Sequence, residues 1–496
     1  KGDAAVLSVE ISGESDDLTY QWQYARHLSD SQYINDITGE TRPTFTAPTE
    51  VGGMRYYRCV VTDKKTGAYV NSDFAKVVVN LGKVNAPVIV YQPGIYSIAG
   101  SSKPTPYKTE YLQGEKIDPI QMVAGTYEAD PNIVRGGLAK VEVEWYYNTK
   151  PSADGATLLD SANYSAPISG GGYNLDDAVG NYVAATVFNY AVTEKLAAGE
   201  HYFYCVASAV ANDDPTNRTS VASDFAKITI KERTGLDGFE GKGSEDNPYL
   251  IETADHLKKI DEYVLGGDFL SGAVFKFDND ITLPLEWEPI GKDNGGKGIN
   301  LLPFSGIIDG GGHTLTVPKG GKPLLEYTRD AVVRNLNIYG EEINGAGLLD
   351  KVTVDYGTDG VYQQYTDPDV ITMENVTLLS GSKTSGSGLA NGGFNSGIND
   401  IIVKNCIIQE NVTVGYDKDQ SDIGSFVGTL NGRIENSVSY ATVYGVRNVG
   451  GLAGKKGQSM GDCEIVNSAL LGTIEATGGN VGGILASGYI SDSAPN

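Results

Sequence analysis

Two stretches of the sequence have the spacing of known ligand-binding loops, and each lacks an essential residue. Residues 291–298 (GKDNGGKG) nearly match a phosphate-binding loop, but Gly298 stands where a magnesium-binding Ser or Thr is required, and no helix pattern follows. Residues 417–422 (DKDQSD) have the alternating carboxylates of a calcium loop without its Gly at the sixth position or its Glu at the twelfth. We expect solvated loops at both places, and therefore no cofactor and no metal site.

His313 invites a catalytic interpretation because the chain has only four histidines. It closes the glycine-rich segment 304–313 (FSGIIDGGGH), which also contains Asp309. To hydrolyse a glycosidic bond, Asp309 would need a second carboxylate about 5–9 Å away, and the sequence indicates none. We expect both residues to belong to a structural turn.

A polar insertion at residues 351–372 is the strongest candidate for a binding loop. Tyrosines supply rigid contact area at low entropic cost, and acidic groups orient polar or basic partners. An acidic flap over one face of the protein is the alternative interpretation. The candidate binding residues are Tyr356, Tyr362, Tyr365, Asp355, Asp359 and Asp367.

The composition favours an all-β chain of two to four domains. Of 496 residues, 63 are Gly and 30 are Tyr, and 20% are charged. The formal net charge of −25 repels nucleic acid and anionic membranes, and no apolar run reaches the roughly 18 residues that cross a bilayer. We therefore expect no nucleic-acid partner and no membrane insertion. The four cysteines are too scattered for a disulfide framework or a zinc site, which favours buried thiols.

An internal period in the second half indicates a stack of similar coils. Asparagines recur 40, 30, 31 and 31 residues apart, an apolar residue stands two positions before each, and charges of alternating sign fill the first four intervening positions. In parallel strands about 4.8 Å apart, the apolar set fills a core, the charges form an outward ladder, and the stacked amides bond their neighbours. The asparagines are Asn335, Asn375, Asn405, Asn436 and Asn467, and the charges are Arg334, Glu374, Lys404 and Glu435.

The same register argues against catalysis. An enzyme built on such a stack usually takes its acids from equivalent positions on successive coils. Here those positions read Asp350, Asn391, Gly428, Gly454 and Ala486, so that functional groups are lost after one step. We expect no catalytic residue and a protein that is not an enzyme.

The first half has the alternating short strands of β-sandwiches. Trp22 with Cys59 and Trp145 with Cys205 occupy core positions of two such units. We expect sandwiches over residues 1–82, with the first strand missing, and 83–232, with long loops. A linker (233–248) and a coil stack (249–496), truncated at its end, follow. A short helix with Thr253 as its N-cap caps the stack.

Two resemblances give these units a family. Residues 1–82, including FTAPTEV at 45–51, resemble bacterial immunoglobulin-like repeats of surface proteins from Gram-positive anaerobes. Residues 432–437 and 449–454 (VGGLAG) resemble the GLUG-type repeats of bacterial adhesins and of some immunoglobulin-cleaving proteases, and the likeness covers most of 245–490. It implies two immunoglobulin-like β-sandwiches followed by a right-handed parallel β-helix.

The resemblance implies an extracellular location on a bacterial cell, with the anchoring segment outside this fragment. Similar architectures in gut bacteria include proteins that capture immunoglobulin, so the expected role is an adhesin or ligand-binding stalk for a host protein, immunoglobulin among them, or a host glycan. Two alternatives stay open. One is a carbohydrate-active β-helix enzyme with immunoglobulin-like accessory domains, either a glycoside hydrolase or a polysaccharide lyase. The other is the non-catalytic front of a larger surface protease.

Overall fold

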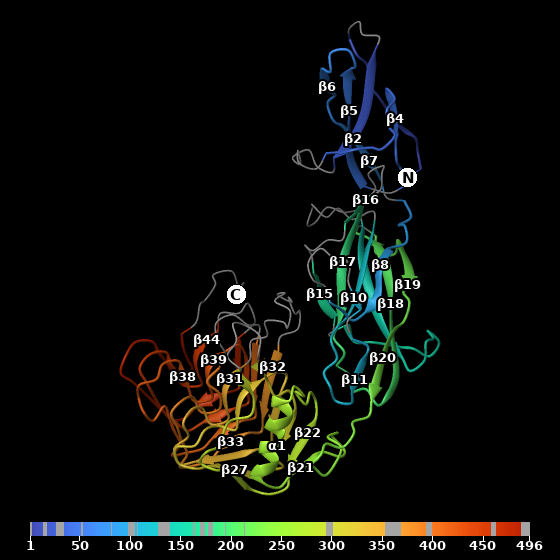
Figure 1. The fold of residues 1–496 in the computed structure, drawn as a ribbon. Coiled ribbons are helices and arrows are strands. Elements are labelled where there is room, and N and C mark those ends of the chain that lie inside the picture. Colours follow the sequence, from blue (N-terminus) through green and yellow to red (C-terminus); the bar gives the residue numbers. More distant parts are fainter. Residues whose placement is uncertain are drawn as a thin grey trace. The chain divides into compact units, whose positions relative to one another are not determined.

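The computed structural model describes residues 2–487 except 13–16, 26–33, 51–52, 81, 98–104, 107, 127–138, 162–163, 169–173, 177–181, 194, 213, 294–300, 353–368, 393–398 and 458–462. Within these ranges the chain is all-β with one α-helix (Figure 1). It divides into two compact units. The first comprises Lys1–Glu110, Ile117–Glu194 and Gly199–Thr229, and the second Tyr111–Lys116, Lys195–Ala198 and Ile230–Asn496.

The N-terminal strands of the first unit form antiparallel sheets around an aromatic core. Trp22 stacks on Phe45 with ring centroids 5.5 Å apart, and it lies opposite Cys59, which is a buried free thiol. One sheet pairs β1 (Ala5–Ser8) with β4 (Thr44–Ala47). The other orders β3 (Asn35–Asp36), β2 (Leu18–Ala25), β5 (Gly53–Asp63) and β6 (Tyr69–Asn71), with β7 (Ala75–Val79) also on β5.

Two larger sheets follow in the chain. In one, Trp145 lies opposite Cys205, as Trp22 lies opposite Cys59. Its order is β11 (Glu110–Leu112), β20 (Ala226–Lys231), β18 (Gly199–Ala211), β13 (Ala139–Asn148) and β14 (Thr157–Leu158), with β19 (Arg218–Ala222) on β18. The other orders β15 (Tyr164–Ile168), β17 (Tyr182–Tyr190), β12 (Ile120–Thr126) and β8 (Val88–Gly94), with β16 (Asn174–Asp176) on β17; β9 (Tyr96–Ser97) and β10 (Thr105–Pro106) pair separately.

A local motif repeats in these two parts of the chain. In each, the cysteine backbone N–H donates to a serine hydroxyl over 2.9 Å, from Cys59 to Ser72 and from Cys205 to Ser223. Each serine begins the sequence SDFAK, at 72–76 and at 223–227. A shared pentapeptide in a shared geometry indicates that the two parts are variants of one module.

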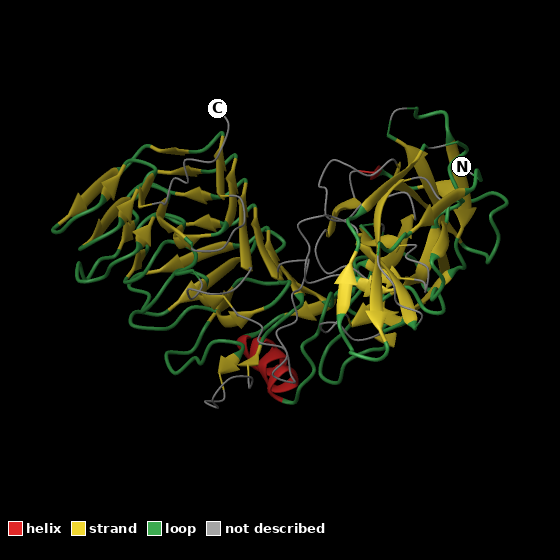
Figure 2. Ribbon diagram, turned by 90° about the horizontal axis from the view of Figure 1, so that it is seen from above, coloured by secondary structure: helices red, strands yellow, loops and turns green. Residues whose placement is uncertain are grey.

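In the second unit the chain winds into coils whose strands join several parallel sheets of different length (Figure 2). The coils lie over one another, because most strands pair in parallel with their counterparts in the next coil. We call the longest of these the ladder sheet. It orders β21 (Tyr249–Ile251), β22 (Val274–Phe277), β26 (Ile307–Asp309), β29 (Val332–Arg334), β32 (Asp369–Glu374), β35 (Asn399–Lys404), β40 (Gly432–Glu435) and β45 (Cys463–Val466).

The remaining faces of the stack are built in the same way. The second sheet orders β23 (Ile281–Thr282), β27 (Thr314–Val317), β30 (Asn337–Gly340), β33 (Thr377–Leu378), β36 (Ile407–Ile408), β41 (Val438–Ser439) and β46 (Ala469–Leu470). Two shorter sheets order β34 (Lys383–Thr384), β37 (Thr413–Val414), β42 (Thr442–Gly445) and β47 (Thr473–Ala476), and β38 (Ile423–Gly424), β43 (Val449–Gly450) and β48 (Val481–Gly482).

The last face, which we call the rim strands, carries the site considered below. Two isolated bridges, Leu349–Ala390 and Ala390–Val427, join its two segments. These segments comprise β28 (Leu325–Thr328) and β31 (Leu349–Val352) on one side of Ala390, and β39 (Val427–Leu430), β44 (Ala453–Lys456) and β49 (Leu485–Ser487) on the other; β24 (Lys292–Asp293) and β25 (Leu301–Leu302) form a separate antiparallel pair.

Apolar columns hold the stack together. Val333, Met373, Val403 and Ile434 lie in register in the ladder sheet and are fully buried. Each such side chain contributes about 1.5–3 kcal/mol by leaving water. Apolar residues 30 to 40 positions apart therefore form one continuous core.

Helix α1 (Ala254–Leu265) covers one end of this core (Figure 2). Its stripe of Leu257, Ile260 and Val264 is fully buried. Thr253 stands at the N-cap position, as expected from the sequence, but its side chain makes no capping hydrogen bond. Burial of the apolar stripe, more than capping, therefore holds the helix in place.

Candidate functional site

An asparagine directly follows the ladder-sheet strand in five coils, where the chain turns a corner. Asn335, Asn375, Asn405, Asn436 and Asn467 all have φ between 48° and 54°. This left-handed conformation is costly for most residues. Glycine adopts it freely, and asparagine tolerates it better than most other residues do. The recurrence of asparagine thus has a conformational cause that the sequence period alone did not reveal.

Two pairs of these corner asparagines are also linked across coils. The Asn375 amide donates to Asn335 Oδ1 over 3.0 Å, and Asn467 donates to Asn436 over 3.4 Å. Asn335 in turn donates to Asp309 Oδ1 over 3.0 Å. Each bond runs from a later coil to an earlier one, and a carboxylate, which only accepts, begins the row.

The ladder charges lie side by side in the order given by the sequence. Arg334 is in register with Glu374, Glu374 with Lys404, and Lys404 with Glu435. Lys404 pairs with Glu374 over 3.1 Å. These residues line one outer edge of the stack and form a charged surface on the ladder sheet, not on the rim strands.

At the two ends of this ladder, the charged side chains form ion pairs with residues other than their expected ladder neighbours. Arg334 bonds Asp309 over 2.9 Å and Glu245 over 2.7 Å, because Asp309 occupies the same ladder position one coil earlier. Glu435 pairs with Arg433 on its own strand over 2.9 Å. Hydrogen bonds to Glu245 and Asp309 raise the pKa of Arg334.

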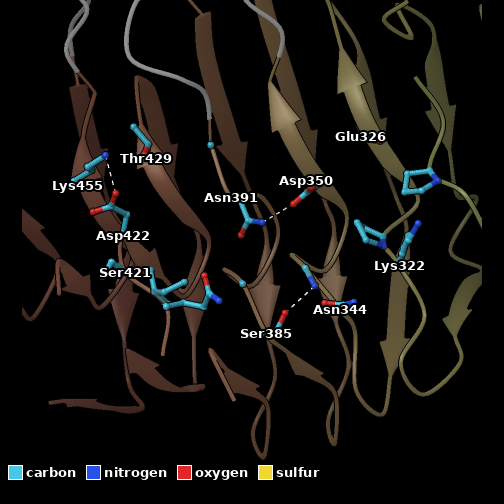
Figure 3. A pocket seen from close by; sticks show the side chains of 17 residues that line it. Lys322, Glu326, Asn344, Asp350, Ser385, Asn391, Ser421, Asp422, Thr429 and Lys455 are labelled. Atoms are coloured by element: carbon cyan, nitrogen blue, oxygen red, sulfur yellow. Dashed lines mark hydrogen bonds and ion pairs between the residues drawn. The ribbon is translucent and has the colours of Figure 1, made fainter. Parts of the chain in front are cut away.

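A groove of about 760 Å³ runs across the rim strands. Side chains from successive coils line it (Figure 3), and most of them are polar. The lining residues on which the site depends are Lys322, Glu326, Asp350, Asn391, Asp422 and Lys455.

Two carboxylates come from adjacent coils at one end of the groove. Leu325 pairs with Leu349 and Tyr327 with Lys351, so Glu326 and Asp350 occupy the same position on neighbouring strands. The sequence register began at Asp350 and missed Glu326. The structure extends the expected register one coil earlier, so that an acid precedes Asp350. The positions that follow Asn391 are Gly428, Gly454 and Ala486, as expected from the sequence.

The structure holds the side-chain amide of Asn391 at both ends. Its Nδ2 donates to Asp350 Oδ1 over 2.7 Å (Figure 3). Its Oδ1 accepts from the Ser387 backbone N–H over 2.9 Å. One amide hydrogen is left over for a further acceptor. A side chain fixed in this way is suited to orient a polar ligand.

At the other end of the groove, Asp422 and Lys455 form an ion pair of 2.7 Å (Figure 3). Asp422 also accepts from the Asn448 amide over 2.5 Å, and Asn480 donates to Asn448 over 2.8 Å. Asp422, Asn448 and Asn480 all have φ between 54° and 61°. They form a second corner row, again begun by a carboxylate.

Glycines make room for these side chains. A Cβ at Gly386 would lie 2.2 Å from Asn391 Oδ1, and one at Gly454 would lie 2.6 Å from the Gly428 carbonyl oxygen. Gly428 and Gly454, expected to be merely inert register positions, are sites of close backbone approach that bring the segment with Asp422 to the groove.

Sequence reasoning missed Glu326 and Lys455, and it placed Asp422 in a solvated loop (417–422), whereas the structure places Asp422 in the groove, paired with Lys455. A signal for Asp422 was present, since Asp422, Asn448 and Asn480 each precede an Ile-Gly or Val-Gly pair. Glu326 and Lys455 offered no such pattern, because the spacing between coils varies on this face.

The remaining candidates lie elsewhere or outside the described ranges. His313 is 3.3 Å from Asp280, and its backbone N–H donates to the Gly310 carbonyl in a tight turn. Within the described part of the chain, no three His, Cys, Asp or Glu side chains gather to hold a metal ion. Residues 294–298 of the phosphate-loop-like segment are outside the description, as are all the candidate binding residues of the polar insertion: Tyr356, Tyr362, Tyr365, Asp355, Asp359 and Asp367.

No family model matches the chain. Over 143 residues it is 32% identical to a protein of Evansella cellulosilytica described as "Putative Gly-rich membrane protein". The match covers 24% of this chain and 15% of that protein, so the chain spans a small part of the relative's length. Within the described ranges, no helix has the length and apolar character to cross a bilayer. The chain is thus an all-β protein of parallel and antiparallel sheets with a partial likeness to a Gly-rich bacterial protein.

Proposed function

We propose that the chain is part of an extracellular bacterial surface protein that binds a glycan in the groove of its coil stack. In this proposal the antiparallel sheets are two immunoglobulin-like β-sandwiches, and the coils form a right-handed parallel β-helix that presents the groove. The groove itself supports the proposal most: fixed amides, hydroxyls and carboxylates from successive coils are the groups that bind sugar hydroxyls.

The polar character of the lining favours a glycan over a protein. Protein interfaces gain most of their affinity from buried aromatic and apolar anchors, and the lining contains Ile423 and prolines but no aromatic side chain among its described residues. A hydroxyl-rich ligand matches the many hydrogen-bonding groups better. Immunoglobulin and other host proteins remain alternative ligands for the test to detect.

Binding can be tested on a glycan array, followed by calorimetry with the best ligand. The Asn391→Ala variant removes the amide fixed between Asp350 and Ser387. It should weaken binding several-fold, up to about tenfold, since a hydrogen bond to an uncharged group contributes roughly 0.5–1.5 kcal/mol. Asn279→Ala is the matched control, because Asn279 is exposed and outside the groove. Equal affinity of the two variants, or binding of immunoglobulin alone, would refute the glycan proposal.

The acid pair supports one other candidate function. Glu326 and Asp350 on adjacent strands, about 4.8 Å apart along the stack, bring two carboxylates near the separation that glycoside hydrolases use. Incubation with neutral polysaccharides distinguishes the two functions. Release of reducing sugar that is lost in Glu326→Gln and in Asp350→Asn would make the protein an enzyme, and intact polysaccharide with measurable binding would support the non-catalytic proposal.

A further inference from the structure

Resting on the proposed function, we infer that the groove selects uncharged glycan chains and rejects those that carry uronate, sialate or sulfate groups. The inference comes from the charges that line the groove. An anionic ligand needs cations that are available to it, and the two lysines among the described lining residues each pair with a carboxylate.

Each lysine has a carboxylate partner. Lys322 Nζ lies 2.8 Å from both oxygens of Glu288. Lys455 Nζ lies 2.7 Å from Asp422, whose other oxygen accepts from Asn448. Both ammonium charges are therefore balanced within the protein.

The Asp350 carboxylate at the other end is balanced differently. Asp350 is held by the neutral amide of Asn391, so that bond positions its carboxylate without cancelling the charge. An incoming anionic sugar would meet like charge at this end, and the formal net charge of −25 for the whole chain acts in the same direction.

The hydrogen-bonding groups that line the groove are mainly neutral. Asn344, Gln420, Ser421 and Thr429 supply amides and hydroxyls in addition to Asn391. From Glu326 to Lys455 the site crosses four coil steps, about 19 Å at ~4.8 Å each. This length and chemistry fit a short, extended and uncharged oligosaccharide that runs along the stack.

The test compares pairs of oligosaccharides that differ in charge alone. One pair is a sialylated and a desialylated form of the same glycan, and the other is a neutral oligosaccharide and the corresponding oligouronide of equal length. Calorimetry on the full chain should show the uncharged member of at least one pair binding about tenfold or more tightly than its acidic partner. The preference should shrink at high salt, which screens the repulsion.

The Asp350→Asn variant provides a second measurement. It keeps an acceptor for Asn391 and removes the negative charge, so the preference for the uncharged ligand should fall several-fold, whereas the exposed control Asp278→Asn should keep the wild-type preference. Equal or tighter binding of the acidic members would overturn this inference and leave the proposed glycan binding intact. If none of the four oligosaccharides binds, both this inference and the proposed glycan binding are overturned.

Discussion

The Asn391 side-chain amide donates to Asp350 Oδ1 over 2.7 Å, although the two residues are 41 positions apart. The same relationship links Asn335 to Asp309 and Asn448 to Asp422. In all three pairs the amide belongs to the later coil and the carboxylate to the earlier one. Because a carboxylate accepts without donating, it can begin a row of amides that all point in one direction.

The corner asparagines should be replaceable by glycine more readily than by alanine. In Asn375→Ala, the left-handed backbone strain of about 1–2 kcal/mol adds to the lost amide bond. Asn375→Gly loses the bond but not the conformation. Hydrogen exchange of the β32 and β35 amides should therefore rise about tenfold more in the alanine variant. Equal exchange in the two variants would show that the amide bond, not the conformation, selects asparagine.

The ladder and the groove differ in how far the sequence could predict them. The sequence could identify the ladder charges because their spacing is nearly constant: the one longer interval, between Arg334 and Glu374, contains the insertion at 351–372. The other ladder charges are Lys404 and Glu435. On the rim strands, Glu326 precedes Asp350 by 24 residues and Asn391 follows by 41. Loops absorb this variation without disturbing strand pairing, so the groove becomes visible only when the coils are stacked.

Asp309 should make the stack sensitive to acid. Burial opposes its ionisation, but hydrogen bonds from Asn335, Gly311 and Arg334 outweigh that effect and lower its pKa below 3.8. The folded state thus favours the carboxylate, and the resulting stability is present above pH 3.8 and lost as the pH falls through the lowered pKa.

The variant Asp309→Asn tests this linkage. It should lower the unfolding temperature of the stack at neutral pH, and the difference from wild type should narrow as the pH falls below 3.8. Scanning calorimetry between pH 7 and pH 3 measures both, with Asp278→Asn as the control. A difference that is the same at every pH would mean that the charge of Asp309 has no part in stability.

Gly386 should be required for ligand binding without being required for folding. A Cβ there would meet the end of the Asn391 side chain at 2.2 Å, and this side chain can move away. In Gly386→Ala the amide should leave Asp350 and glycan affinity should drop about tenfold, with the unfolding temperature nearly unchanged. In the control, Gly479→Ala, the added methyl meets nothing within 4 Å, and affinity should be retained. Full affinity in Gly386→Ala would exclude the fixed amide as a binding group.

The central claim is that residues about 30 positions apart lie directly over one another, and disulfide formation tests it most directly. The background is Cys463→Ser, because Cys463 is the most accessible thiol and burial raises the pKa of Cys205 and of Cys406 to about 12. In Glu374→Cys/Lys404→Cys the Cα atoms of neighbouring strands are ~4.8 Å apart, within disulfide range. In Glu374→Cys/Glu435→Cys they are two strands, or about 9.6 Å, apart.

Peptide mapping by mass spectrometry after mild oxidation reads out both pairs. The stacked register predicts an intramolecular disulfide between positions 374 and 404 and none between 374 and 435. A disulfide between positions 374 and 435, or none between 374 and 404, would contradict the register and with it the groove that the register builds.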